Sequence, residues 1–217
     1  MRRLGGAEGA AGWPRALNEG RRVLTVVTGP VRSGKSSFAL QLARRSGKAA
    51  LYVATALVDP ADREMTARVA RHRAERSDLR TVEVDERSGS GIASVLGGLG
   101  RDDIAVVDSL GTWLGGLLLG EEERAEREPL AVADTLAAWA EKFRVAVAAM
   151  KADAVIVSEE AGWGVVPPSP LGRIFRDEVG RTTAALARSA TRVYLVVAGH
   201  AVDVRAVGEP IAGDGCG

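Results

Sequence analysis

The segment from Gly29 to Ser36 has the residue types and spacing of a loop that binds nucleotide phosphates. Its sequence, GPVRSGKS, matches the pattern G-x-x-x-x-G-K-[ST] at every fixed position. Glycines let the backbone curl so that several N–H groups point at phosphate oxygens. Lys35 would reach the terminal phosphates, and the Ser36 hydroxyl would bind Mg²⁺. The residues assigned to this phosphate site are Gly29, Pro30, Val31, Arg32, Ser33, Gly34, Lys35 and Ser36.

The flanking residues favour phosphate binding over the alternative, a glycine turn that binds nothing. Residues 23–27, VLTVV, are apolar and largely β-branched, which is typical of a buried parallel strand. Residues 35–45 predict a helix that ends at Ser46-Gly47, and the N-terminus of this helix would add partial positive charge to the loop. Pro30 is the one unfavourable residue, because it lacks a backbone N–H near the start of the loop.

Asp108 is the candidate carboxylate for the metal ion. It follows the apolar run Ile104 to Val107, at the carboxyl end of a predicted buried strand. Ligands of open α/β sheets bind at this end of the strands, and an acidic residue here would hold Mg²⁺ together with Ser36. The alternative is that Asp108 caps the next helix.

His72 is surrounded by arginines in a helix predicted over residues 62–76. An imidazole can attack an α-phosphorus and carry a nucleotidyl group, and arginines such as Arg71 and Arg73 would neutralise the phosphates. The alternative is a half-buried histidine that ends an apolar stripe, and the residues alone favour it. His200, expected in a turn after the last strand, has no basic cluster and is the weaker candidate.

The elements that must position these residues alternate along the chain. Residues 110–119 are apolar but contain three glycines, so their sequence predicts neither helix nor loop. Residues 121–129 are expected to be a solvated loop or helix end. Gly162 to Pro170 is expected to be a loop. Strands are predicted at 23–27, 49–54, 80–84, 104–108, 154–157 and 193–197, and helices at 35–45, 62–76, 92–99, 130–150 and 171–187.

Strands separated by helices indicate a mainly parallel sheet covered on both faces. We therefore predict an α/β, three-layer fold of the P-loop NTPase (RecA-like) type, in one catalytic domain over residues 23–204. Residues 1–22 are expected to be a flexible extension and residues 205–217 a loose tail.

Composition excludes several other classes of protein. Lys plus Arg number 29 against 28 Asp plus Glu, and aromatic residues make up 4%, which argues against a nucleic-acid-binding face. The single cysteine, Cys216, excludes a disulfide framework and a cysteine metal site within one chain. No apolar run approaches the roughly 18 residues of a membrane span, and no signal peptide is evident, so the cytoplasm is expected.

The phosphate loop is the first of several motifs that occur in a fixed order along the chain. They are Thr28-Gly29, Arg32 to Ser36, Leu51 to Ala56, Asp62 to Met65, Arg68, His72-Arg73, Thr81 to Glu83, Val106 to Leu110, Gly164 to Pro167, Leu171 to Arg173, Phe175 to Asp177, Gly180-Arg181 and Leu195 to Gly199. In this order they resemble the bifunctional adenosylcobinamide kinase / adenosylcobinamide-phosphate guanylyltransferase family of cobalamin biosynthesis. The resemblance extends from about Val23 to Val204, most of the chain.

The resemblance implies two reactions on one scaffold. One phosphorylates adenosylcobinamide with ATP or GTP, and the other transfers GMP from GTP to the resulting phosphate through a guanylylated histidine that aligns with His72. It also implies Mg²⁺ dependence, a corrinoid substrate and a homotrimer with sites between subunits. The further nucleotide contacts that it implies are Thr55, Ala56, Leu57, Arg73, Ala74, Glu75, Arg76, Glu83 and Asp108.

The chain departs from the family pattern at two places. Glu159 stands where relatives usually carry Asn, and residues 182–185, TTAA, replace a more polar stretch. The Glu159 change adds negative charge near a phosphate or corrinoid site. Two other hypotheses remain open: a P-loop kinase of another small alcohol with a structural His72, and a non-catalytic GTP-binding module.

Overall fold

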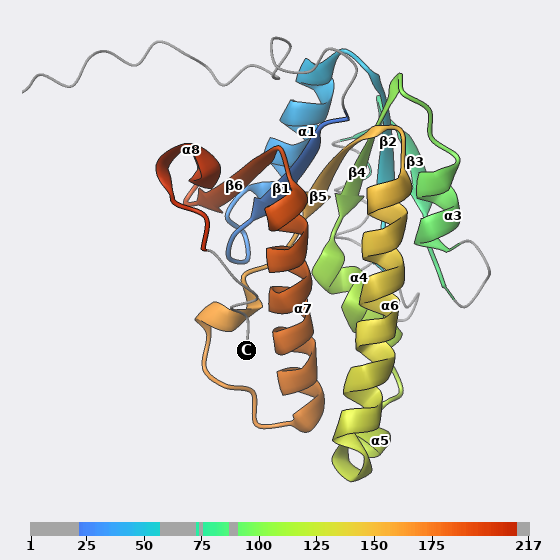
Figure 1. Ribbon diagram of the computed structural model, residues 1–217, viewed down its shortest axis with the longest axis vertical. Coiled ribbons are helices and arrows are strands. Elements are labelled where there is room, and N and C mark those ends of the chain that lie inside the picture. The colour runs from blue at the N-terminus through green and yellow to red at the C-terminus, as the bar shows by residue number, and fades with distance from the viewer. Residues whose placement is uncertain (1–21, 57–72, 74–75, 87–90, 212–217) are drawn as a thin grey trace, which may run out of the picture.

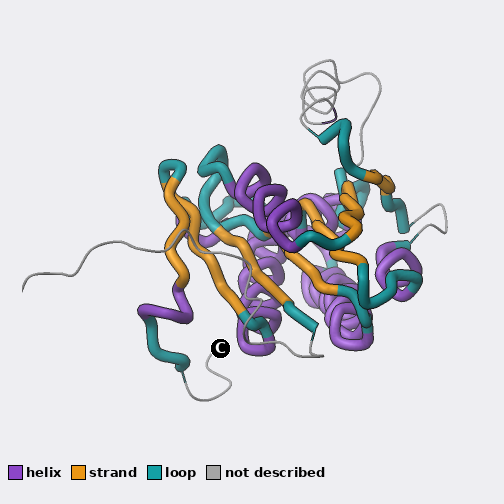
Figure 2. Tube along the Cα trace, turned by 90° about the horizontal axis from the view of Figure 1, so that it is seen from above, coloured by secondary structure: helices purple, strands orange, loops and turns teal. Residues whose placement is uncertain are grey.

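A seven-stranded sheet lies between two layers of helices in a computed structural model that describes residues 22–56, 73, 76–86 and 91–211 (Figures 1 and 2). The strands are β1 Leu24–Thr28, β2 Ala49–Ala54, β3 Arg80–Glu83, β4 Asp103–Asp108, β5 Asp153–Val157, β6 Arg192–Val197 and β7 His200–Asp203. The helices are α1 Lys35–Ser46, α3 Ile92–Gly97, α4 Leu110–Leu117, α5 Glu122–Arg127, α6 Pro129–Ala149, η1 Ala161–Trp163, α7 Pro170–Ser189 and α8 Val204–Val207. The helix predicted over residues 62–76, including His72, lies almost entirely outside the described residues, as do Leu57, Ala74 and Glu75.

The sheet confirms the predicted α/β fold. Its strand order is β3-β2-β4-β5-β1-β6-β7, and β7 pairs antiparallel with β6 while all the other neighbours are parallel. The phosphate loop therefore follows a central strand, β1, whose neighbours are β5 and β6. Within the described part of the chain, no helix has both the length and the apolar character needed to cross a bilayer.

Side chains alternate between the two faces of the sheet and build two cores. In β4, Ala105 and Val107 face the helices α3, α4, α6 and α7, whereas Ile104 and Val106 face α1. This period of two is the expected property of an extended strand. By the same alternation Asp108 follows Val106 onto the α1 face, where the phosphate loop also lies. The alternation of side chains along β4 thus places the Asp108 carboxylate on the same side of the sheet as the phosphate loop.

Four segments differ from the expectations or resolve them. The undecided residues 110–119 contain α4, and the predicted solvated segment contains α5. Residues 193–197 were expected to form the last strand, but a further strand follows them. The chain turns at Ala198-Gly199 and returns as β7, which begins at His200. Helix α8 then crosses the expected start of the loose tail, since the Asp203 carboxylate accepts hydrogen bonds from the backbone N–H groups of Arg205 and Ala206.

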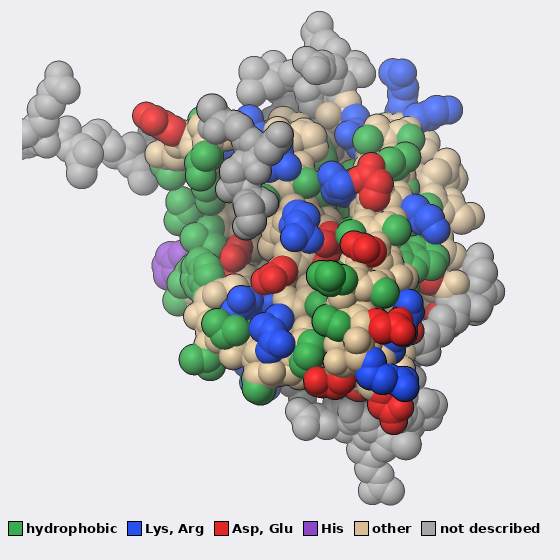
Figure 3. All heavy atoms as spheres, turned by 60° about the horizontal axis from the view of Figure 1, so that its bottom comes forward, with side chains coloured by type: hydrophobic (Ala, Val, Ile, Leu, Met, Phe, Trp, Pro, Cys, Tyr) green, Lys and Arg blue, Asp and Glu red, His purple; other side chains and the backbone are tan. Residues whose placement is uncertain are grey.

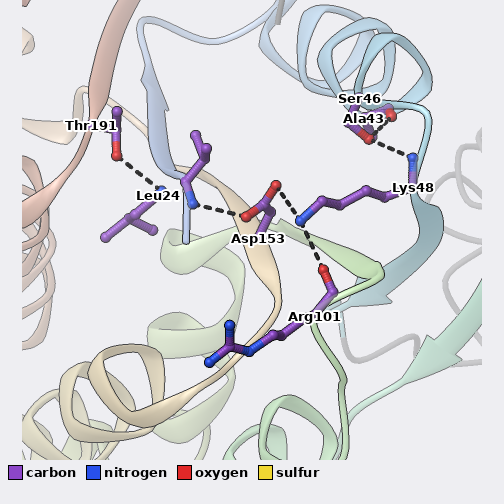
Figure 4. Close-up of polar contacts among 8 residues, drawn as sticks. Leu24, Ala43, Ser46, Lys48, Arg101, Asp153 and Thr191 are labelled. Carbon is purple, nitrogen blue, oxygen red and sulfur yellow. Dashed lines mark hydrogen bonds and ion pairs between the residues drawn. The ribbon is translucent and has the colours of Figure 1, made fainter. Parts of the chain in front are cut away.

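A buried carboxylate ties the amino ends of the central strands together, at the edge opposite the phosphate loop. Asp153 is 2% exposed; its Oδ1 accepts from the backbone N–H of Val23 at 2.8 Å, and its Oδ2 lies 2.8 Å from Lys48 Nζ (Figure 4). Lys48 Nζ also donates to the carbonyl of Arg101 at 2.8 Å. The start of β5 is thereby joined to the segments that enter β1, β2 and β4.

We predict that Asp153→Ala lowers the free energy of unfolding by about 3 kcal/mol, because it leaves the buried N–H of Val23 without its acceptor and Lys48 without its carboxylate partner. Urea denaturation of the variant measures this change. Glu141→Ala is the matched control, since Glu141 pairs with Arg144 on the exposed surface of α6 and such pairs contribute little. Equal destabilisation in the two variants would contradict the role assigned to Asp153.

Candidate active site

The phosphate loop is shaped by a close approach of two backbones. Gly29 has φ 150°, and a Cβ built on it would lie 2.2 Å from the carbonyl oxygen of Val196 in β6. Gly34, with φ 100°, precedes the first residue of α1. Lys35 is only 8% exposed, and its Nζ donates to the carbonyl of Pro30 at 2.8 Å. The lysine therefore lies across the inside of the loop.

Segments on both sides hold the loop by main-chain hydrogen bonds. On the β5 side, the N–H of Glu160 donates to the carbonyl of Gly29 at 3.1 Å, and Thr28 Oγ1 donates to the Glu160 carboxylate at 2.6 Å. On the β6 side, the N–H of Gly199 donates to the carbonyl of Ser33 at 3.0 Å. The turn at Ala198-Gly199, which the sequence predicted without a role in the site, is thus a wall of the phosphate loop.

The remaining loop residues present different surfaces. Val31 is 72% exposed, and Arg32 is exposed with φ 58°. Ser36 is half-buried. Ser33 is 5% exposed, and its Oγ has no hydrogen-bond partner among the described residues. A buried hydroxyl without a partner requires an explanation, and a phosphate oxygen bound in the loop would supply the missing acceptor.

Asp108 is not the cap of the helix that follows it. The cap of α4 is Ser109, whose Oγ accepts from the N–H of Thr112, while the Thr112 hydroxyl accepts from the N–H of Ser109. The helix-cap alternative for Asp108 is therefore wrong. Its carboxylate Oδ2 instead accepts a hydrogen bond from the hydroxyl of Tyr52 at 2.5 Å.

Thr55 lies within this cap rather than on the surface. It is 2% exposed, and its hydroxyl oxygen accepts from the N–H of Ser109 at 2.7 Å and lies 2.6 Å from Thr112 Oγ1. Ala56, the next residue of the implied nucleotide set, is half-buried. The structure thus uses the Thr55 side chain to fix the turn after β4.

Glu159, the departure from the family pattern, is held at the start of α4. Its Oε1 accepts from the hydroxyl of Ser109, and its Oε2 accepts from the N–H of Gly111 at 2.9 Å. Burial raises the pKa of Glu159, and the hydrogen bond from Ser109 and the positive charge of Lys35 oppose that rise. The added carboxylate is therefore part of the protein's own hydrogen-bond network.

Three carboxylates act on Lys35. Burial lowers the pKa of Lys35, and the negative charges of Glu159, Asp108 and Glu160, in that order, oppose this effect. Of these residues only Asp108 was predicted to belong to the site. Glu159 was singled out only by the family pattern, and Glu160 carried no signal. The site therefore brings the loop lysine, the end of β4 and the end of β5 together.

The three other predicted nucleotide contacts within the described residues lie beside β2 and β3. Arg73 and Glu83 are exposed and form an ion pair with each other. Arg76 is 5% exposed, and its guanidinium carbon lies 3.9 Å from the centroid of the Tyr52 ring. The structure thus connects Arg76 to Asp108 through a single side chain, Tyr52.

Acidic and basic side chains are interspersed over the face seen in Figure 3. Among the described residues, no group of three or more His, Cys, Asp or Glu side chains could hold a metal ion alone. The described part of the site therefore offers Mg²⁺ only a few hard oxygen donors, as is usual where substrate phosphates complete the coordination.

His200 is exposed, and its Nδ1 lies 2.9 Å from the carbonyl oxygen of Ala198.

We predict that Gly29→Ala destabilises the protein by about 3 kcal/mol, from backbone strain at positive φ and overlap with the Val196 carbonyl. Gly47→Ala is the control, because Gly47 also has positive φ, 71°, but a Cβ there meets nothing within 4 Å. The control should cost about 1 kcal/mol. Thermal denaturation compares the two, and equal losses would refute the close approach.

A second prediction concerns Glu159 and pH. Its folded-state pKa lies above the ordinary 4.5, so the folded protein keeps this proton to a higher pH than the unfolded chain does. The free energy of unfolding of the wild type should therefore fall, relative to Glu159→Gln, as the pH rises from about 4.5 through the raised pKa, and then level off. Urea denaturation at a series of pH values measures this difference.

The exposed Glu123→Gln supplies the reference for removing a carboxylate from the surface. A difference between wild type and Glu159→Gln that stays constant with pH would contradict the prediction.

Comparison with known proteins places this sequence in a family. Residues 25–204 match the family described as Cobinamide kinase / cobinamide phosphate guanyltransferase. The Bifunctional adenosylcobalamin biosynthesis protein CobU of Escherichia coli is 33% identical over 191 residues, which cover 84% of this chain and 100% of that protein. The Bifunctional adenosylcobalamin biosynthesis protein CobP of Pseudomonas aeruginosa is 35% identical over 188 residues, which cover 86% of this chain and 98% of that protein.

Among solved structures, the flagellar accessory protein FlaH of Methanocaldococcus jannaschii matches with a TM-score of 0.37 and 13% identity, over 82% of this chain and 74% of that one. This likeness is too low to carry weight beside the sequence relatives. The family match and the two relatives each cover most of the chain, and the residues of the family match include the phosphate loop and Asp108. The chain belongs to the cobinamide kinase / cobinamide phosphate guanyltransferase family.

Proposed function

We propose that this chain phosphorylates adenosylcobinamide with a nucleoside triphosphate and transfers GMP from GTP to the resulting phosphate. Family membership supports the reaction type. The observation that carries the proposal for this chain is the phosphate loop, with Lys35 lying inside it and the Asp108 carboxylate acting on that lysine.

The loop can take the triphosphate without rebuilding its backbone. The two wall segments fix its curl, as the hydrogen bonds to Gly29 and Ser33 show. Lys35 Nζ now donates to the carbonyl of Pro30, and phosphate oxygens would replace this acceptor with a charged one.

The residues present also fit a magnesium ion. Ser36 and Asp108 offer a hydroxyl and a carboxylate, the hard oxygen donors that Mg²⁺ prefers, and phosphate oxygens and water would supply the remaining ligands. When bound, the ion would neutralise part of the charge on the phosphates. Ser36 lies in the first turn of α1, and Asp108 is the last residue of β4. Two rigid elements would therefore hold the two ligands.

His72 is the proposed carrier of the GMP group. An imidazole nitrogen would attack the α-phosphorus of GTP, the bond from that phosphorus to the bridging oxygen would break, and pyrophosphate would leave. A phosphate oxygen of adenosylcobinamide phosphate would then attack the same phosphorus and release the free imidazole. His72 lies outside the described residues, so this assignment depends on the family resemblance and on the neighbouring arginines.

We predict that GTP labelled in the α-phosphate leaves acid-labile label on the wild-type protein and none on His72→Ala. His200→Ala is the matched control: it removes the chain's other histidine, which is exposed and lies on the β6–β7 hairpin, and it should label like the wild type.

Lys35→Ala should weaken GTP binding by about tenfold or more, since it removes charge-assisted contacts to phosphate.

The competing hypotheses give different results in the same assay. A kinase of another small alcohol would show no protein label, together with transfer of the γ-phosphate that survives His72→Ala. A non-catalytic module would bind GTP and transfer nothing to cobinamide or its phosphate. Equal labelling of the wild type and His72→Ala would remove the histidine from the reaction.

A further inference from the structure

Tyr52 makes two contacts that a buried strand residue does not need for packing. Its hydroxyl donates to Asp108 Oδ2 at 2.5 Å, and its ring lies 3.9 Å beneath the guanidinium carbon of Arg76. Its pattern in the sequence indicates only a buried position in β2. The structure places it between the candidate metal carboxylate and an arginine implied to contact the nucleotide.

The register of the sheet explains how Tyr52 reaches Asp108. In the parallel pair β2 and β4, Tyr52 lies opposite Val106 and Ala54 lies opposite Asp108. Side chains two positions apart share a face, so the tyrosine and the aspartate both lie on the α1 face. Ala54 leaves room between them, and the long tyrosine side chain spans one step along the strand direction to meet the carboxylate.

The tyrosine hydroxyl donates its hydrogen bond inside the protein. Tyr52 is 3% exposed. A phenol keeps its proton at neutral pH, so the hydroxyl donates and the Asp108 carboxylate accepts. The hydrogen bond to Asp108 is charge-assisted, which makes it stronger than a bond between neutral groups.

Arg76 holds the other side of the ring. A guanidinium over an aromatic face is attracted by the ring's quadrupole, and the attraction is larger where water is excluded. Arg76 is 5% exposed, and its Nε has no hydrogen-bond partner among the described residues. The ring therefore has little freedom to turn away from Asp108.

We propose that Tyr52 is a positioning residue, whose hydroxyl fixes the Asp108 carboxylate in the orientation that a metal–nucleotide complex requires. The inference rests on the proposed function, because that proposal assigns Asp108 to Mg²⁺. Tyr52 acts through Asp108 and needs no contact with the nucleotide itself. Its loss should therefore change the metal dependence of binding and leave metal-free binding unchanged.

The test is equilibrium binding of a fluorescent GTP analogue to the full chain, with Mg²⁺ and with a chelator. In Tyr52→Phe the ring stays under Arg76 and only the hydroxyl is lost. The gain in affinity produced by Mg²⁺ should fall about tenfold, as expected for the loss of a hydrogen bond to a charged group. The affinity measured in the chelator should match the wild type.

Tyr194→Phe is the matched control. Tyr194 belongs to the same core as Tyr52, is 5% exposed, and packs edge-to-face on Phe38 of α1 with ring centroids 5.0 Å apart. Removing its hydroxyl changes the same atom in the same layer but in a different strand. This variant should keep the full effect of Mg²⁺, so a fall in both variants would mean a general loss of packing and would overturn the inference.

A double-mutant cycle with Asp108→Asn shows whether the tyrosine acts through the carboxylate. In that background, Tyr52→Phe should have no further effect on the Mg²⁺ dependence, because the group it positions is gone. Additive effects would overturn the inference. If the wild type binds no GTP, the proposed function fails; if Mg²⁺ strengthens binding equally in wild type and Tyr52→Phe, only the role of Tyr52 fails.

Discussion

The contact between Gly29 and the carbonyl of Val196 is the constraint on which the site depends. Since no side chain fits between these two backbones, the chain leaving β1 must run tightly against β6 before it enters α1. This path turns Lys35 back into the loop and brings the β6–β7 turn within hydrogen-bonding distance of Ser33. The phosphate loop is therefore a product of the whole central sheet, with β1 held between β5 and β6.

Most of the fold was predictable because its strands are short apolar runs with clear ends. Helix α4 was left undecided because three of its eight residues are glycines, and its stability comes from the Ser109 cap and from packing. Gly111 is required there by a distant residue, since a Cβ would lie 2.2 Å from the Glu159 carboxylate. Strand β7 was missed because Ala198-Gly199 lacks the Asn-Gly signal of a tight hairpin, although both residues have positive φ.

The site was predictable only where a local motif defines it. The phosphate loop and Asp108 belong to such motifs, whereas Tyr52, Glu159 and Glu160 reach the site through contacts between residues far apart in the chain. No local pattern reports that the end of β5 meets the start of α4. The roles of His72 and its neighbours stay predictions, because those residues lie outside the described part of the chain.

The walls of the phosphate loop have a consequence for how this sequence can diverge. The bonds from Glu160 to Gly29 and from Gly199 to Ser33 join main-chain atoms, so apart from Gly199, whose positive φ favours glycine, they depend on the backbone path more than on the side chains of the two wall segments. Substitutions in those segments can accumulate during evolution while the shape of the loop is inherited intact. Selection at the walls would then act on chain length and backbone path, and an inserted or deleted residue there would be purged far more strongly than an exchanged one.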